Sequence, residues 1–168
     1  MKVKISLFIT CAIAMASCVD IPDFNNTPEI EYNSIDHFKG EDSFGNPVEQ
    51  ITVTIDFQDG DGDLGASLEE RSDSVKYSDW GNYELKTFVK EGNSWVEQQS
   101  SIDSNQFFPV LKTDGKSGPI KGTLDFRTTA PYFGGAKLVY HKYKVRIRDR
   151  ALRVSNQVDT DSILLPRN

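Results

Sequence analysis

An all-β chain forming a single immunoglobulin-like or fibronectin-like antiparallel β-sandwich is the fold class that this sequence predicts. The length of 168 residues suits one domain. About seven short segments alternate apolar and polar residues, clusters of Gly, Pro, Asn, Asp and Ser separate them, and no segment sustains a helical period. Seven such strands in about 140 residues favour a sandwich, with a small barrel as the alternative.

Residues 1–17 precede this domain and have the pattern of a signal peptide. Lys2 and Lys4 are followed by an apolar run over residues 5–16 that closes on small residues. The run is about a dozen residues long, whereas a membrane-spanning helix needs roughly 20. The sequence therefore predicts an export signal and no membrane-spanning anchor.

The segment Met15-Ala16-Ser17-Cys18 resembles the lipobox of bacterial lipoproteins, with Met15 where that pattern usually has Leu. The resemblance implies that Cys18 is acylated, becomes the first mature residue and holds the protein on a lipid membrane. An ordinary cleavage site followed by an incidental cysteine is the alternative. Residues 18–28 (CVDIPDFNNTP) lack periodicity and contain two prolines, which predicts a lipidated cysteine and short tether before the sandwich at 29–168.

The individual strands follow from alternation. Residues 50–57 place Ile51, Val53, Ile55 and Phe57 on one face. Residues 83–90 and 95–98 form an expected hairpin, and Gly122 is an expected weak point or bulge in the strand that contains Ile120, Leu124 and Phe126. In residues 139–148 the inward face is Val139, His141, Tyr143, Val145 and Ile147, and the outward basic stripe is Lys142, Lys144, Arg146 and Arg148. Less regular patterns predict strands at 29–35, 106–111 and 157–165.

The segment DGDGDLG, residues 59–65, carries the strongest chemical signal. Asp59, Asp61 and Asp63 alternate with glycines that let the backbone turn tightly, so their carboxylates can converge on a calcium ion. The spacing, with Glu70 at position twelve, is that of an EF-hand loop, but Leu64 stands where that loop needs Gly and a strand precedes it. We therefore predict a calcium site on a β scaffold, and a solvated acidic turn is the alternative.

A second loop bears on this choice. In a sandwich of this order, the loops after the second and sixth strands lie at the same end. Asp149 opens the later loop and is an expected fourth ligand, with Asn156 or a backbone carbonyl as further candidates. Arg150 offers a competing arrangement, because it could pair with the aspartates and make a metal unnecessary.

The lipobox, the segment VTIDFQDGDGDLG and the segment VRIRDRALRVSNQVDT together resemble uncharacterised lipoproteins of Bacteroidota. In that family a DGDGDLG segment and a DRA-x-x-x-SN segment bracket an Ig-like domain, and the likeness covers residues 29–165. The resemblance implies the outer membrane as location, at either its periplasmic face or the cell surface, and it implies the fold. It carries over no catalytic residue.

Composition and motifs exclude several function classes. With 25 acidic and 19 basic residues the chain has a formal charge of −6 and no polybasic patch, which argues against a nucleic-acid partner. An enzyme is not expected: a mature chain starting at Cys18 lacks a thiol nucleophile and known catalytic motifs. Of its two histidines, His141 falls on an apolar strand face and His37 in an expected polar loop.

Two binding hypotheses follow. In the first, the calcium-stabilised sandwich is a binding, docking or structural module of the cell envelope that uses its basic stripe or an unpaired sheet edge. In the second, it binds carbohydrate through exposed loop aromatics, for which Trp80, Tyr132 and Phe133 are the candidates. Coplanar exposed rings would favour the glycan, and burial of these rings would favour docking.

Overall fold

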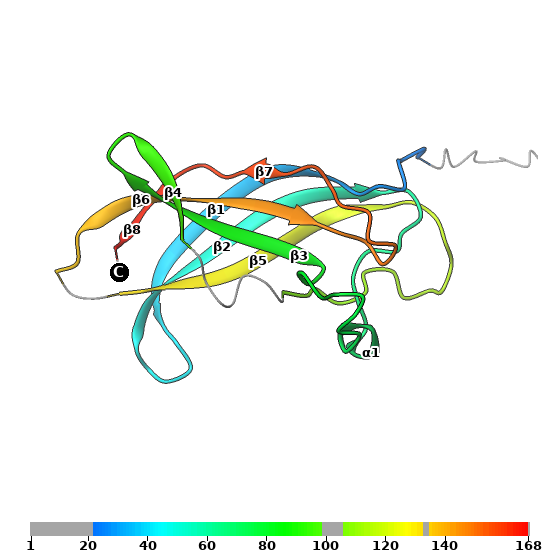
Figure 1. The fold of residues 1–168 in the computed structure, drawn as a ribbon, viewed down its shortest axis with the longest axis horizontal. Helices are drawn as coiled ribbons and strands as arrows, with labels where there is room; N and C mark the ends of the chain where they lie inside the picture. Colours follow the sequence, from blue (N-terminus) through cyan, green and yellow to red (C-terminus); the bar gives the residue numbers. More distant parts are fainter. Residues whose placement is uncertain (1–21, 99–105, 133–134, 168) are drawn as a thin grey trace, which may run out of the picture.

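Two antiparallel sheets face each other in a computed structural model that describes residues 22–98, 106–132 and 135–167 (Figure 1). The predicted signal peptide, Cys18 and Phe133 lie outside the described residues. The first sheet has the order β1-β2-β5, and the second has the order β4-β3-β6-β7, with β8 also paired to β6. The strands are β1 (Glu29–Glu41), β2 (Pro47–Asp59), β3 (Tyr83–Glu91), β4 (Ser94–Gln98), β5 (Ile120–Pro131), β6 (Leu138–Ile147), β7 (Val158–Asp159) and β8 (Ile163–Pro166).

This arrangement confirms the predicted all-β sandwich. The alternation expected in β2 is present, because Ile51, Val53, Ile55 and Phe57 are all buried while the residues between them are partly exposed. The pattern works because successive side chains of a strand point to opposite faces, and only one face of this sheet packs on the other sheet. The predicted hairpin is also present, with β3 and β4 joined through Gly92 and Asn93.

Strand β6 confirms its predicted inward face but corrects its basic stripe. His141, Tyr143, Val145 and Ile147 are buried. Arg148, predicted to point outward, is only 4% exposed, because β6 ends at Ile147 and the Arg148 guanidinium turns back onto the carbonyl oxygen of Gly81 at 2.7 Å. The cation is therefore stabilised by backbone acceptors inside the domain.

The predicted strand at 106–111 is wrong apart from a single bridge between Gln106 and Tyr83. The buried Asn82 side chain bonds the middle of this segment: its amide donates to the Phe108 carbonyl at 2.9 Å, and the Phe108 N–H donates to it at 2.8 Å. A side chain here takes the place of a strand ladder, and Pro109 offers no N–H for one.

Other expected strands differ in extent. Strand β1 continues beyond residue 35 to Glu41 after a bulge between Tyr32 and Ser34, and residues 157–165 contain β7 and the start of β8 instead of one strand. Gly122 is not a bulge, since β2 and β5 pair without a register shift. A Cβ there would lie 3.2 Å from the Phe57 ring, so glycine allows close packing at this position. The four-residue helix α1 (Leu68–Arg71) was not expected.

The core fills the space between the sheets. Tyr83 stacks on Phe126 with ring centroids 4.3 Å apart, and Phe108 packs beside both rings. Strands β2 and β6 end at the same end of the sandwich. Strands β1, β3 and β5 begin at that end, because each of them pairs antiparallel with β2 or β6. We call this end of the sandwich the aspartate pole, since the DGDGDLG loop follows β2 there.

Candidate metal centre

The DGDGDLG loop leaves β2 at Asp59 and is held tightly against its neighbours. The N–H of Gly60 donates to the carbonyl of Asn25 in the preceding tether at 2.8 Å. Gly62 and Gly65 have φ of +72° and +92°, and a side chain on either would overlap a backbone carbonyl, of Gly118 and Pro109 respectively. Only glycine tolerates both the positive φ and the close approach of a backbone carbonyl, so the glycines between the aspartates let the loop fold this closely.

Asp149 reaches the same place from the other sheet. An isolated bridge pairs Leu64 with Asp149, and the N–H of Arg150 donates to the carbonyl of Asp63 at 3.3 Å. Leu64 is fully buried and fastens the loop to the core. The loops after the second and sixth strands therefore meet, as the predicted fold required.

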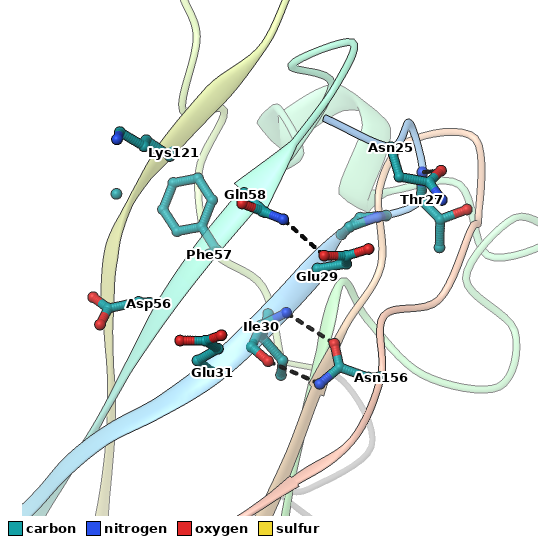
Figure 2. Close-up of a pocket in the computed structure, with 12 residues that line it drawn as sticks. Asn25, Thr27, Glu29, Ile30, Glu31, Asp56, Phe57, Gln58, Lys121 and Asn156 are labelled. Atoms are coloured by element: carbon teal, nitrogen blue, oxygen red, sulfur yellow. Dashed lines mark hydrogen bonds between the residues drawn. The ribbon is translucent and has the colours of Figure 1, made fainter. Parts of the chain in front are cut away.

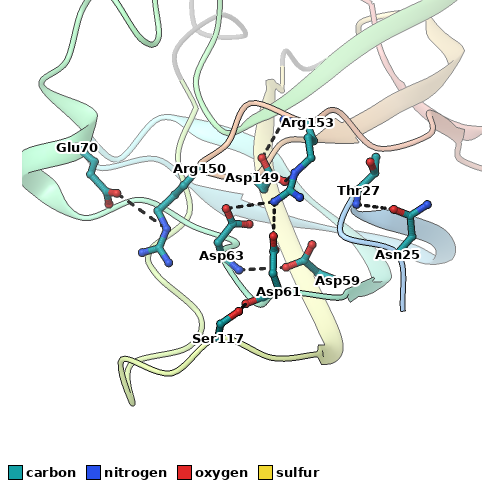
Figure 3. A network of polar contacts seen from close by, with 10 residues as sticks. All are labelled: Asn25, Thr27, Asp59, Asp61, Asp63, Glu70, Ser117, Asp149, Arg150 and Arg153. Atoms are coloured by element: carbon teal, nitrogen blue, oxygen red, sulfur yellow. Dashed lines mark hydrogen bonds and ion pairs between the residues drawn. The ribbon is translucent and has the colours of Figure 1, made fainter. Parts of the chain in front are cut away.

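One carboxylate oxygen from each of Asp59, Asp61, Asp63 and Asp149 lies within 4.8 Å of the others (Figure 3). We call these four residues the aspartate cluster. Calcium binds oxygen at about 2.3–2.6 Å, so two ligands of one calcium ion lie at most about 5 Å apart. Magnesium binds at about 2.0–2.1 Å, which sets a limit near 4.2 Å. The observed span fits a calcium ion without rearrangement.

Three oxygens of the aspartate cluster have no hydrogen-bond donor among the described residues: Oδ1 of Asp59, of Asp61 and of Asp63. All three are shielded from solvent, and the Asp59 side chain as a whole is buried, with 0% of the residue exposed. A buried acceptor left unpaired costs about 1–3 kcal/mol, and a charged one costs more. These oxygens accordingly need a proton or a cation.

The electrostatics agree with that requirement. Burial, followed by repulsion from Asp61 and Asp63, raises the pKa of Asp59 to about 6. Burial, followed by the charges of Asp149 and Asp61, likewise raises the pKa of Asp63 to about 6. Burial also opposes ionisation of Asp61, but hydrogen bonds with Arg153 and Asp63 and the charge of Arg153 together outweigh it and hold the pKa of Asp61 below its usual value. Two of the four carboxylates are thus costly to ionise together.

Arg153, which the sequence did not single out, is the cation that contacts the aspartate cluster. Its guanidinium lies 2.6 Å from Asp149 and 2.5 Å from Asp61. Arg150, the cation considered as an alternative to a metal, lies 4.0 Å from Glu70 instead. In the sequence, only the position of Arg153 four residues after Asp149 points to this contact. That spacing predicts a contact only if the shape of the turn between the two residues is known.

The further ligand candidates are occupied elsewhere. The Asn156 side chain both donates to and accepts from the backbone of Ile30, at 2.8 and 2.9 Å. Glu70 accepts from the N–H of Ser67 at 2.8 Å in the capping box of α1. Neither belongs to the aspartate cluster, so the EF-hand spacing of Glu70 has no structural counterpart here.

The aromatic candidates do not form a common platform. Trp80, predicted to be exposed, is only 6% exposed, because the guanidinium groups of Arg146 and Arg148 lie over its ring at 4.9 and 4.3 Å from the centroid. Tyr132 is half-buried at the opposite end of the sandwich, where Lys39 donates to its hydroxyl at 2.9 Å. Phe133 lies outside the described residues.

The remaining basic stripe is neutralised within the domain. Lys142 lies 2.7 Å from Asp159, and Arg146 lies 2.5 Å from Glu84.

His141 is buried as expected, with burial lowering its pKa and its Nδ1 lying 3.1 Å from the Val139 carbonyl. His37 lies in β1 rather than in a loop, 3.3 Å from Glu49.

A groove of about 860 Å³ adjoins the aspartate pole (Figure 2). The tether residues Asn25 and Thr27 form one side, and the Phe57 ring and Lys121 lie across from them. Gln58 donates to Glu29 across β1 and β2 at 2.7 Å. The groove holds no set of groups that resembles catalytic machinery among its described lining residues.

No family model matches the chain, and neither does any curated protein or solved structure. The described part of the chain also contains no helix with the length and apolarity that a membrane crossing requires.

Proposed function

We propose that this protein is a lipid-anchored module of the bacterial cell envelope whose β-sandwich is stabilised by calcium at the aspartate cluster. One observation carries the metal assignment: four carboxylates meet within 4.8 Å while three of their oxygens are buried without a donor. Asp59, Asp61, Asp63 and Asp149 would each supply one oxygen, and water would complete the six to eight ligands that calcium takes. The role of the ion is structural, because it joins loops from the two sheets.

The anchoring proposal depends on the sequence, through the signal peptide and Cys18. It places the protein in the outer membrane, as the resemblance to Bacteroidota lipoproteins implies. A binding, docking or structural role is favoured over carbohydrate binding because Trp80 is buried and Tyr132 lies at the other end of the domain. Strand β5, paired only to β2 among the described strands, offers an edge for docking of another protein.

Calcium titration tests the metal site directly. The protein from residue 19 onward retains the whole described sandwich, and it is compared with a double variant, Asp61→Asn with Asp63→Asn. We expect calcium to bind the parent and raise its melting temperature, by mass action on the folded state. Magnesium should act more weakly because the cluster must contract to fit it. Asp125→Asn, on the outer face of β5, is the control for loss of a carboxylate away from the pole.

Two results would refute the assignment. Calcium that binds neither parent nor control would show that protons and Arg153 suffice for the aspartate cluster. An equal calcium response in the parent and the double variant would place binding elsewhere on this acidic protein.

A further inference from the structure

The Arg153 guanidinium contacts three members of the aspartate cluster, and in each of them it contacts the Oδ2 oxygen. Its guanidinium lies 2.5 Å from Oδ2 of Asp61, 2.6 Å from Oδ2 of Asp149 and 3.5 Å from Oδ2 of Asp63. Figure 3 shows the guanidinium between the Asp149 carboxylate and those of Asp61 and Asp63, with no dashed line from it to the Asp59 carboxylate. One cation thus joins carboxylates that the fold brings from two sheets.

The other oxygen of these carboxylates, Oδ1, does not contact the guanidinium. Oδ1 of Asp61 and Oδ1 of Asp63 are buried without a donor, as is Oδ1 of Asp59. These three oxygens are therefore open to a metal ion while the guanidinium keeps its contacts with Oδ2, whereas both oxygens of Asp149 already accept from Arg153, Oδ1 from its backbone N–H and Oδ2 from its guanidinium.

The turn that carries Arg153 is itself shaped by Asp149. The N–H of Arg153 donates to Oδ1 of Asp149 at 2.8 Å, and the N–H of Asp149 donates to the carbonyl of Arg153 at 3.2 Å. Leu152 takes up a left-handed conformation, with φ of 65°, to close the turn. The backbone fixes Arg153 over the cluster, so the contact does not depend on the side chain alone.

The charges show why both cations have a place. Four ionised aspartates carry four negative charges, of which Arg153 balances one and a divalent ion two more. With Arg153 alone, the cluster keeps an excess of negative charge in a buried setting, where repulsion is strong.

We propose that Arg153 is a resident counter-ion that keeps the aspartate cluster assembled without metal and, by its charge, lowers the affinity for calcium. The sandwich thus stays folded when calcium is scarce and is stiffened when calcium is plentiful. This inference rests on the proposed calcium site, and it makes Arg153 a positioning residue that is not itself a ligand.

The test compares Arg153→Gln with Arg153→Lys and with the control Arg150→Gln. Gln removes the charge, Lys keeps it without the planar fork that spans several carboxylates, and Arg150 pairs with Glu70 instead of the cluster. Melting temperatures are measured in chelator and in calcium, and calcium affinity is measured by calorimetry on the protein from residue 19 onward.

We expect Arg153→Gln to melt lower than the parent in chelator, to recover in calcium and to bind calcium at least tenfold more tightly. Arg153→Lys should keep an affinity near that of the parent, and Arg150→Gln should match the parent throughout. Tighter binding is the decisive readout, because a residue that only holds the loop in shape would weaken calcium binding when removed.

The outcomes separate this inference from the proposed function. If only Arg153→Gln responds to calcium, the natural site is closed to metal, so the calcium proposal falls together with the stiffening of the natural protein by calcium, and only the counter-ion role of Arg153 stands. If the parent binds calcium and Arg153→Gln binds it equally or less tightly, the inference is refuted and the calcium site stands. If no variant binds calcium, both fail.

Discussion

Replacing Asp59 by Asn should stabilise the calcium-free protein, although Asp59 is a fully buried polar residue. Its pKa is raised from 3.8 to about 6, by burial first and then by the charges of Asp61 and Asp63. A shift of about two pKa units corresponds to about 3 kcal/mol of unfavourable interaction in the ionised form. Asn keeps an oxygen for the N–H of Asp63, which Asp59 now accepts at 3.1 Å, and its amide can donate to a neighbouring carboxylate.

The expected gain in the free energy of unfolding at pH 7.5 in chelator is therefore about 1–3 kcal/mol, since part of the repulsion is relieved by relaxation. In calcium the order should reverse, because the variant has lost a charged ligand and gains less from the ion. Urea denaturation followed by tryptophan fluorescence measures both conditions, with Asp125→Asn as the control. A variant less stable than the parent in chelator would refute the reasoning, because it would show that Asp59 is held by favourable contacts and not strained by its neighbours.

Three further predictions concern pH, the core and the anchor. The pKa values of Asp59 and Asp63 are raised to about 6 in the folded state, so between pH 7.5 and 5.5 the folded state takes up protons that the unfolded state does not. The free energy of unfolding in chelator should therefore rise by about 1 kcal/mol for each group as the pH falls from 7.5 to 5.5. A melting temperature that falls over this range would contradict the pKa shifts. Asn82→Ala should cost about 1–3 kcal/mol in urea denaturation, since it leaves the buried N–H of Phe108 without a partner, while the Phe108 carbonyl still accepts from the N–H of Ala66 at 3.1 Å; a loss below 1 kcal/mol would mean that water replaces the amide. Cys18→Ser should move the protein from the membrane to the soluble fraction of cells, and continued membrane association would refute anchoring through Cys18.

The parts of the fold that could be predicted are those that a local pattern determines. The alternation of Ile51 to Phe57 marks β2 because one face of its sheet is buried, and the same rule marks the inward face of β6. The convergence of Asp149 on the DGDGDLG loop followed from strand order alone, since it needs only that two loops leave the same end of a sandwich.

The parts that could not be predicted depend on contacts distant in sequence. Residues 106–111 look like a strand, but their backbone bonds to residues distant in sequence, as when the Asn82 side chain bonds the N–H and carbonyl of Phe108 and the N–H of Leu111 donates to Leu64. Trp80 follows an Asp on a loop and was expected in solvent, yet Arg146 in β6 and Arg148 just after that strand cover its ring. The choice between Arg150 and Arg153 depended on a turn closed by Leu152 at positive φ, a conformation that its residue type does not suggest.

The position of the aspartate cluster bears on how the module would meet a partner. The tether that leads back toward Cys18 is fastened to the loop by the bond between Gly60 and Asn25, so the cluster lies at the end of the sandwich from which an anchor would extend. At the far end, the turn between β1 and β2 presents Phe44 with 87% of its surface exposed. If Cys18 is lipidated and the aspartate cluster binds calcium as proposed, the ion would stiffen the end nearest the membrane and leave the sheet edges and the Phe44 turn available to another envelope protein. A docking role is therefore compatible with a metal site that contacts no partner, because the ion would fix the base of the domain while recognition takes place elsewhere.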